Sequence, residues 1–210
     1  MNDLNETDQL QLWRSEFGRS YIERNAPDEK TLASLERMWK RMLELAVPPP
    51  ARILEVGCNI GLNLRALRRF TEAELFAVEP NSAAREHVIA DKVLSADHIY
   101  DGSAARLPLS NHAVDLAFTM GVMIHIHPDN LAASCREIFR VTSRFVLCSE
   151  YYSAEPRELN YRGHKGQLFL RDYGAFWQQT CPSLVLVDYG FFWTGAGAAD
   201  NLTWWLFRKS

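Results

Sequence analysis

Residues 53–61 read Ile53-Leu54-Glu55-Val56-Gly57-Cys58-Asn59-Ile60-Gly61. The aliphatic residues of this stretch predict a strand that is buried on both faces. Gly57 and Gly61 lack the side chains that would keep a ligand away from the backbone. A helix beginning just after Gly61 would direct its unpaired N–H groups at a ligand in the turn. The stretch therefore predicts a ligand-binding turn between a buried strand and a helix.

The spacing of the glycines decides which nucleotide the turn suits. A dinucleotide fingerprint requires Gly-x-Gly-x-x-Gly after the strand, but Asn59 and Leu62 stand where two of its glycines belong. A second predicted strand, 75–79, ends in Glu79. Glu79 follows Glu55 at a spacing close to about 20 residues. In doubly wound folds, this is the spacing at which an acid reaches the ribose hydroxyls of a ligand. The missing glycines argue against a dinucleotide, and the second acid stands where a ribose would be bound.

The pattern Glu55-x-Gly57-x-x-x-Gly61 resembles the first motif of the class I S-adenosylmethionine (SAM) methyltransferases, with Asn59 replacing a glycine. Residues 102–109 resemble the adenine-binding stretch of these enzymes, with Ser103 replacing its acid. The resemblance implies an α/β, Rossmann-like class I methyltransferase fold. Its seven-stranded sheet is mostly parallel, with an antiparallel last strand and helices on both faces. The implied SAM-binding residues are Glu55, Gly57, Asn59, Gly61, Glu79, Pro80, Ser103, Ala104, Ala105 and Met120.

Apolar periodicity and capping residues predict the remaining elements. Helices are expected near 28–46, 62–70, 81–88, 129–141 and 173–180, and strands near 93–100, 113–118, 144–150, 184–192 and 201–208. Residues 1–46 are expected to form a helical lid and cover, although the apolar residues of 1–25 can equally pack on the core. Residues 47–210 would then be the SAM-binding domain of a single globular unit. Residues 151–164 are expected to be a substrate-binding loop because they are long, aromatic and charged.

Several polar residues are candidates for catalysis or substrate binding. His125 and His127 follow the strand 113–118, where open α/β sheets bind ligands, and imidazole accepts a proton near neutral pH. They can equally bind only local backbone groups. The arginines can clamp a carboxylate or phosphate, or they can pair with Glu158 or Asp172. The catalytic candidates are His125, Glu150, Tyr152 and Tyr161, and the substrate-binding candidates are Tyr21, Arg24, Arg162 and Arg171.

Composition limits the classes of function. The chain has 210 residues and a net charge of −3, so it is expected to be one domain without an electrostatic footprint for nucleic acid. It has no apolar run approaching the roughly 18 residues of a membrane span, and its polar N-terminus is unlike a signal peptide.

The four cysteines form no Cys-x-x-Cys pair, which favours buried thiols in the cytoplasm. No metal site is predicted, because the two histidines lack a carboxylate or cysteine at ligand spacing. The oligomeric state stays open.

The chain also resembles one particular subgroup of these methyltransferases, over roughly residues 13–208. Residues 16–25, 121–128, 150–152, 161–164 and 171–172 resemble segments of the pseudaminic acid biosynthesis-associated methylase family. This resemblance implies methyl transfer from SAM to a small polar metabolite. One alternative is a cyclase that converts SAM itself to azetidine-2-carboxylate and methylthioadenosine. A second alternative is a SAM-binding accessory protein without catalytic activity.

Overall fold

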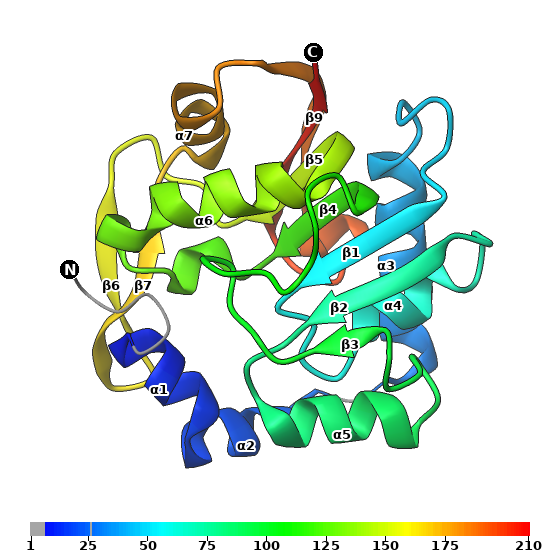
Figure 1. Cartoon of the computed structure of the whole chain (residues 1–210). Coiled ribbons are helices and arrows are strands. Elements are labelled where there is room, and N and C mark those ends of the chain that lie inside the picture. The colour runs from blue at the N-terminus through cyan, green and yellow to red at the C-terminus, as the bar shows by residue number, and fades with distance from the viewer. Residues whose placement is uncertain (1–6, 26) are drawn as a thin grey trace.

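The computed structural model describes residues 7–25 and 27–210 (Figure 1). A seven-stranded sheet with the order β3-β2-β1-β4-β5-β9-β8 runs through the molecule. The neighbouring strands from β3 to β5 are parallel, whereas β9 is antiparallel to both β5 and β8. This arrangement confirms the predicted fold. The strands are β1 (Arg52–Val56), β2 (Glu74–Val78), β3 (Ile99–Tyr100), β4 (Val114–Met120), β5 (Thr142–Glu150), β8 (Leu184–Phe192) and β9 (Leu202–Lys209).

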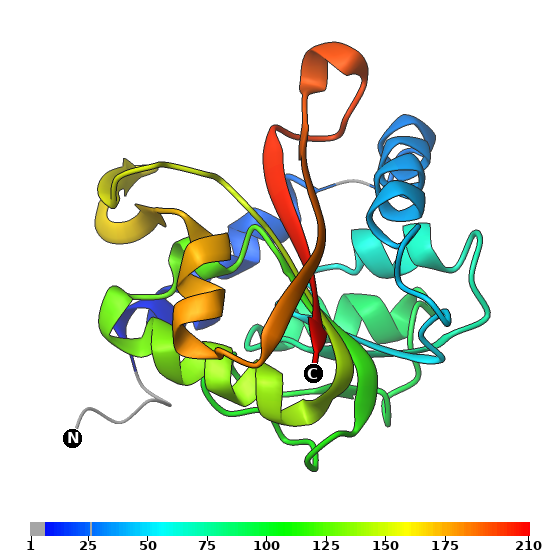
Figure 2. The same ribbon diagram turned by 90° about the horizontal axis from the view of Figure 1, so that it is seen from above.

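Helices cover both faces of the sheet because consecutive strand residues point to opposite sides (Figure 2). Ile53 of β1 packs in one core cluster and Leu54 packs in the other. The first cluster contains residues of α3 (Glu29–Met42), α4 (Leu62–Leu67) and α5 (Ser82–Ala90), and the second contains residues of α6 (Pro128–Val141) and α7 (Tyr173–Thr180). None of the described helices is both long enough and apolar enough to cross a membrane.

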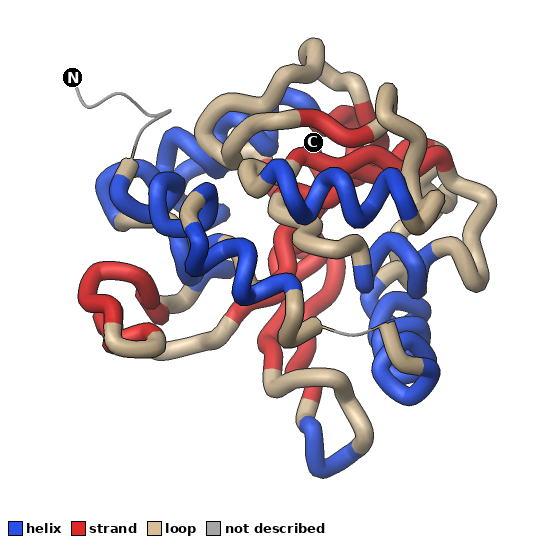
Figure 3. Tube along the Cα trace, turned by 90° about the horizontal axis from the view of Figure 1, so that it is seen from below, coloured by secondary structure: helices blue, strands red, loops and turns tan. Residues whose placement is uncertain are grey.

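Two segments beyond the sheet lie side by side at one end of the molecule (Figures 1 and 3). The first is the helix pair α1 (Asp8–Arg14) and α2 (Glu16–Ile22), and the second is the hairpin of β6 (Arg157–Tyr161) and β7 (His164–Leu170). The side-chain amide of Gln9 donates to the carbonyl oxygen of Gly166 at 2.8 Å, and the rings of Phe17 and His164 are 5.3 Å apart. We call these segments the lid (residues 8–22) and the hairpin (residues 157–170). The expected lid also included residues 1–6 and 26, which lie outside the described residues.

The structure differs from the sequence expectations at β3 and at the hairpin, since neither β6 nor β7 was predicted as a strand. Residues 157–161 form a strand instead of part of a loop, and they pair with β7 through a turn at Arg162 and Gly163, both with positive φ. β6 is exposed along most of its length, and its only apolar alternation, Leu159 and Tyr161, is too short to predict a strand. β3 is confined to two residues, because Val93 and Leu94 are instead buried after the end of α5. Two short 3-10 helices, η1 (Met123–His125) and η2 (Thr194–Ala196), complete the fold.

Candidate active site

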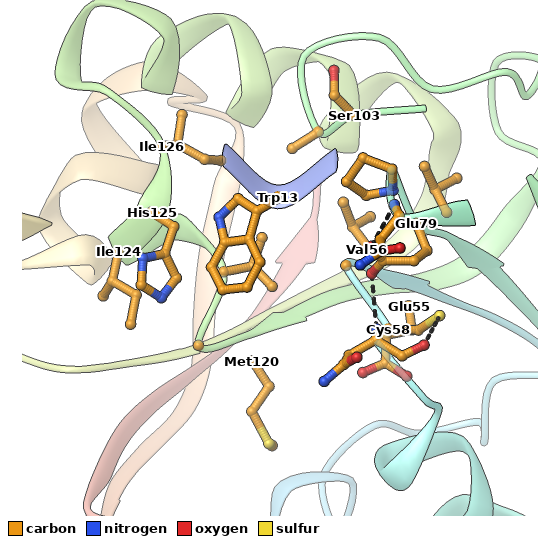
Figure 4. Close-up of a pocket in the computed structure, with 18 of the residues that line it drawn as sticks. Trp13, Glu55, Val56, Cys58, Glu79, Ser103, Met120, Ile124, His125 and Ile126 are labelled. Carbon is orange, nitrogen blue, oxygen red and sulfur yellow. Dashed lines mark hydrogen bonds between the residues drawn. The ribbon is translucent and has the colours of Figure 1, made fainter. Parts of the chain in front are cut away.

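A cavity of about 410 Å³ lies at the carboxyl ends of β1, β2 and β4, where the glycine turn begins (Figure 4). Its volume falls within the range of roughly 300–1,000 Å³ that is typical of small-molecule sites. The lid contributes Trp13 and Tyr21 to its lining, and the hairpin contributes Tyr161. The cavity is therefore built from segments that are far apart in the sequence, among them the lid, the strand ends with the connections that follow them, and the hairpin.

The turn after β1 adopts the backbone that the glycines predicted. Gly57 has a φ of +81°, and a Cβ at this position would lie 2.7 Å from Cγ2 of Val122. Gly61 has a φ of +75° and is the N-cap of α4, so it supports the turn without lining the cavity. Asn59, which replaces the middle glycine, has a φ of +46°. Asparagine visits the left-handed region more readily than most residues, so the turn keeps its shape without the third glycine.

The two predicted acids line the cavity at the ends of neighbouring strands. Glu55 is 2% exposed, and its Oε1 accepts a hydrogen bond from the Asn63 side chain at 2.7 Å. Its Oε2 is buried without a partner. Burial raises the pKa of Glu55 well above its usual value, and the nearby charge of Glu79 acts in the same direction. The free oxygen is therefore an unused acceptor facing a ligand site.

Glu79 is fixed by the backbone on both sides. Its Oε2 accepts from the N–H of Asn59 at 2.8 Å, and its Oε1 accepts from the N–H of Asn81 at 2.9 Å. Burial raises the pKa of Glu79, while these two hydrogen bonds counteract part of the rise. Across the cavity edge, Oγ of Ser103 is buried without a protein partner. Pro80, Ala104, Ala105 and Met120 also line the cavity, as the resemblance implied.

Aromatic rings form the opposite wall. The ring centroid of Trp13 lies 5.0 Å from that of His125 and 5.2 Å from that of Tyr21, and the rings of His125 and Tyr161 are 4.7 Å apart. Figure 4 shows Trp13 and His125 on one side of the cavity, with Glu55 and Glu79 on the other. The sequence placed Trp13 only in an apolar stripe, so its position in the cavity comes from the docking of the lid.

His125 is held as a neutral imidazole. Its Nδ1 lies 2.6 Å from the carbonyl oxygen of Gln167, which can only accept, so Nδ1 carries the proton and donates. Burial lowers the pKa of His125 to about 4. Nε2 therefore keeps an open lone pair across the physiological pH range. His127 also lines the cavity, and its Nδ1 accepts from the N–H of Asp129 at the start of α6.

Two of the four catalytic candidates lie away from the cavity. Glu150 is fully buried beneath η1, where its Oε1 accepts from the N–H groups of Val122 at 3.3 Å and Met123 at 3.1 Å. Tyr152 is 48% exposed and does not line the cavity. Glu150 is thus placed to position the segment that carries His125, not to touch a ligand. Burial raises the pKa of Glu150 to about 7.

The three candidate arginines also lie outside the cavity lining. Arg24 is exposed, Arg162 sits at the turn of the hairpin, and the guanidinium of Arg171 lies 4.9 Å from the Phe176 ring centroid. The expected arginine clamp is therefore absent from this cavity among the described residues. The acids suggested as their partners have other roles, since Glu158 accepts from the Gly166 N–H and Asp172 caps α7.

The structure adds cavity residues that no sequence motif indicated. Asp200 lines the cavity from the connection between β8 and β9, and its Oδ2 accepts from the hydroxyl of Tyr151 at 2.7 Å. Leu35 and Met38 of α3 line it from the other side, with Asn63 of α4. These residues come together only in the folded chain. No group of three or more potential metal ligands occurs in residues 7–25 and 27–210.

Fold and site together define a protein with the Rossmann-like class I methyltransferase fold. Residues 54–145 match a family model described as a methyltransferase domain. Comparison with curated proteins gave no match. The family match and the solved structures that share the fold support the class I SAM-dependent methyltransferase superfamily, and they indicate SAM as the cofactor.

Three of these solved structures show the range of the fold. The 1,6-didemethyltoxoflavin-N1-methyltransferase of Burkholderia thailandensis, solved with S-adenosylhomocysteine (SAH), is 17% identical with a TM-score of 0.69, over 95% of this chain and 88% of that one. The magnesium protoporphyrin IX methyltransferase of Synechocystis, solved with SAM, is 9% identical with a TM-score of 0.66, over 98% and 99% of the two chains. The [4+2]-cyclase SpnF is 14% identical with a TM-score of 0.60, over 83% and 80%.

Proposed function

We propose that this protein is a SAM-dependent methyltransferase that acts on a small polar metabolite, in line with its resemblance to the pseudaminic acid biosynthesis-associated methylases. The observation that carries the proposal is the pair of buried acids, Glu55 and Glu79, at the ends of neighbouring strands beside the glycine turn. The four cysteines are free and buried, which supports a reducing, cytoplasmic location.

The residues of the cavity fit SAM. The unpartnered Oε2 of Glu55 suits the ammonium group of the aminoacyl end, and Glu79 suits the ribose hydroxyls. The unpartnered Oγ of Ser103 can bind an edge of the adenine. When bound, SAM supplies a methyl group activated by the positive charge on sulfur. The contacts of Glu55 and Ser103 use atoms without a protein partner, and those of Glu79 use the second lone pairs of oxygens that already accept from the backbone.

The remaining residues orient the acceptor and exclude water. We propose that residues 1–46 act as lid and cover, because Trp13 and Tyr21 line the cavity from the lid and Met38 lines it from α3. Nε2 of His125 is an acceptor placed for a hydrogen bond to the methyl acceptor, and the hydroxyl of Tyr161 lies on the same wall. Such positioning is the main contribution that a protein makes to a displacement with an activated leaving group.

The enclosing aromatic wall favours one second candidate. If no acceptor enters, the amine of SAM can attack its own side chain, giving azetidine-2-carboxylate and methylthioadenosine. The fold is not confined to proteins described as methyltransferases, because SpnF, described as a [4+2]-cyclase, shares the fold. A non-catalytic SAM-binding role is the third candidate, and it predicts binding without any product.

Calorimetry tests whether the cavity binds SAM. We expect SAH to bind the wild-type protein and to lose at least tenfold in affinity in Glu79→Ala, about 1.4 kcal/mol. Glu74→Ala is the matched control, because Glu74 begins the same strand and is exposed. Absence of binding to wild-type protein, or undiminished affinity in Glu79→Ala, would contradict the proposed site.

Mass spectrometry separates the three candidate functions. The protein is incubated with SAM alone and then with SAM and a small-molecule extract of the source cells. SAH formed only with the extract supports methyl transfer, and methylthioadenosine formed from SAM alone supports the cyclase. Binding without either product supports the accessory role.

A further inference from the structure

The charge of the cavity lining limits the kind of acceptor that it can hold. Its described lining contains three carboxylates, Glu55, Glu79 and Asp200, and no arginine or lysine. A carboxylate or phosphate on the acceptor would be buried there without a charged partner and beside like charges. The lining therefore selects against an anionic acceptor.

Asp200 is not needed for the ammonium group or the ribose of SAM. One SAM molecule offers one ammonium group and one ribose diol, which match Glu55 and Glu79. Asp200 belongs to a different wall, formed by the connection between β8 and β9 and by Tyr151 after β5. Its Oδ1 accepts from the N–H of Asn201 at 2.7 Å, and its Oδ2 accepts from the Tyr151 hydroxyl at the same distance. Both bonds fix the carboxylate, and each oxygen retains a second lone pair for a ligand.

Three tyrosines line the same cavity as this carboxylate. Tyr21 of the lid, Tyr151, and Tyr161 of the hairpin all line the cavity, and Tyr151 donates its hydroxyl to Asp200. Burial raises the pKa of Tyr21 to about 12, with Asp200 contributing, so this side chain stays a neutral phenol. Neutral aromatic faces beside a carboxylate attract an ammonium group.

We infer that the methyl acceptor is a small amine, which Asp200 binds as an ammonium ion among Tyr21, Tyr151 and Tyr161. The inference rests on the proposed methyltransferase function. The ammonium gives one proton to the Asp200 carboxylate, which leaves a nitrogen lone pair. That pair forms a bond to the methyl carbon of SAM while the carbon–sulfur bond breaks, and the electrons of the broken bond stay on sulfur. The products are SAH and the N-methylated ammonium ion.

The experiment uses the full-length protein and SAM with an isotopic label on its methyl group. A small-molecule extract of the source cells is divided by ion exchange into cationic, neutral and anionic fractions. We expect labelled product only from the cationic fraction, and a loss of at least tenfold in its rate of formation with Asp200→Asn. The asparagine keeps an oxygen for the Tyr151 hydroxyl, and SAH affinity by calorimetry should stay within threefold of wild type. Asp188→Asn, which removes a partly buried carboxylate of β8 that pairs with Arg41 outside the cavity, is the control.

Each other outcome has a defined meaning. Labelled product from only the neutral or anionic fraction overturns the amine acceptor and leaves the methyltransferase standing. A tenfold loss of SAH affinity in Asp200→Asn shows that this acid binds the cofactor, which also overturns the inference. Methylthioadenosine from SAM alone, or no labelled product from any fraction, overturns both the inference and the proposed function.

Discussion

Glu150 is a carboxylate that the fold keeps away from water at the end of β5. It is fully buried, and it binds the N–H groups at the start of η1 through one oxygen, while its Oε2 has no partner. Burial is the main cause of its raised pKa, because removing a charge from water disfavours the ionised form. Protonation of Glu150 should therefore affect the stability of the segment that carries His125, because Glu150 binds the N–H groups of that segment.

We expect Glu150→Gln to stabilise the protein relative to wild type at pH 8 and less so at pH 5. The pKa is about 7 in the folded state against a usual value of 4.5, so the folded state holds a proton that the unfolded state has lost between these pH values. Wild-type stability therefore falls as pH rises through this window, by up to about 3 kcal/mol. Urea denaturation at both pH values measures the difference. Glu155→Gln, an exposed control, should show none; an equal effect at both pH values would contradict the prediction.

Asn59 shows how a single residue can replace a glycine of the motif. We expect Asn59→Ala to lose roughly 1 kcal/mol of stability, because its Cβ must occupy the left-handed region without the local hydrogen bonding available to asparagine. Asn59→Gly is the matched variant and should stay within about 0.5 kcal/mol of wild type. Chemical denaturation of both variants checks this. Equal stability of the two would mean that the turn relaxes out of the left-handed conformation.

At the scale of elements, the lid is positioned by close backbone contact. Gly18 of α2 is buried, and a Cβ there would lie 1.9 Å from the carbonyl oxygen of Trp13 and 2.8 Å from Nδ2 of Asn81. The first of these atoms belongs to the backbone, so it cannot move without displacing α1. The absence of a side chain at Gly18 is what allows the lid to reach the N-cap of α5 and to hold Trp13 in the cavity.

We expect Gly18→Ala to lower the affinity for SAH by about tenfold while the core stays folded, because the lid must shift away from the cavity. Calorimetry measures the affinity, and the thermal unfolding midpoint of the ligand-free protein monitors the core. Ser20→Ala, in the same helix, is the control and should bind like wild type. Unchanged affinity in Gly18→Ala would show that the lid does not contribute to binding.

At the scale of the whole molecule, the lid and the hairpin enclose the cavity as one unit. They are far apart in the sequence but are joined by the Gln9–Gly166 hydrogen bond and by the packing of Phe17 on His164. His125 connects both to the sheet, because it bonds the Gln167 carbonyl of the hairpin and packs on Trp13 of the lid. A ligand that fixes one segment should therefore fix the other.

We expect SAH to slow amide hydrogen exchange in residues 8–22 and 157–170 together, because each segment supports the other over the cavity. Hydrogen-exchange mass spectrometry with and without SAH gives the comparison. Peptides from α7, which does not line the cavity, serve as the internal control. Protection confined to the turn after β1 would show that the two segments do not act as one unit.

Local sequence patterns were sufficient for the sheet and for the cofactor side of the cavity. The aliphatic run of β1, the glycines of its turn and the acid at the end of β2 lie within short segments, so their spacing carries the geometry. Parallel strands then bring Glu55 and Glu79 to the same edge of the sheet, as predicted. Ser103 reaches the same edge of the sheet for the same reason, because it lies on the connection that follows β3, the strand beside β2.

The chain by itself thus determined the fold class, the ligand-binding turn and the two acids. Only the tertiary structure decided the other wall of the cavity, where Trp13, Tyr161 and Asp200 meet from three distant segments. The tertiary structure also places Glu150 and the three candidate arginines outside the cavity lining. The physical reason is that these positions depend on how the lid and hairpin dock and on which strand residue faces inward, and such long-range packing leaves no periodic signal in a single sequence.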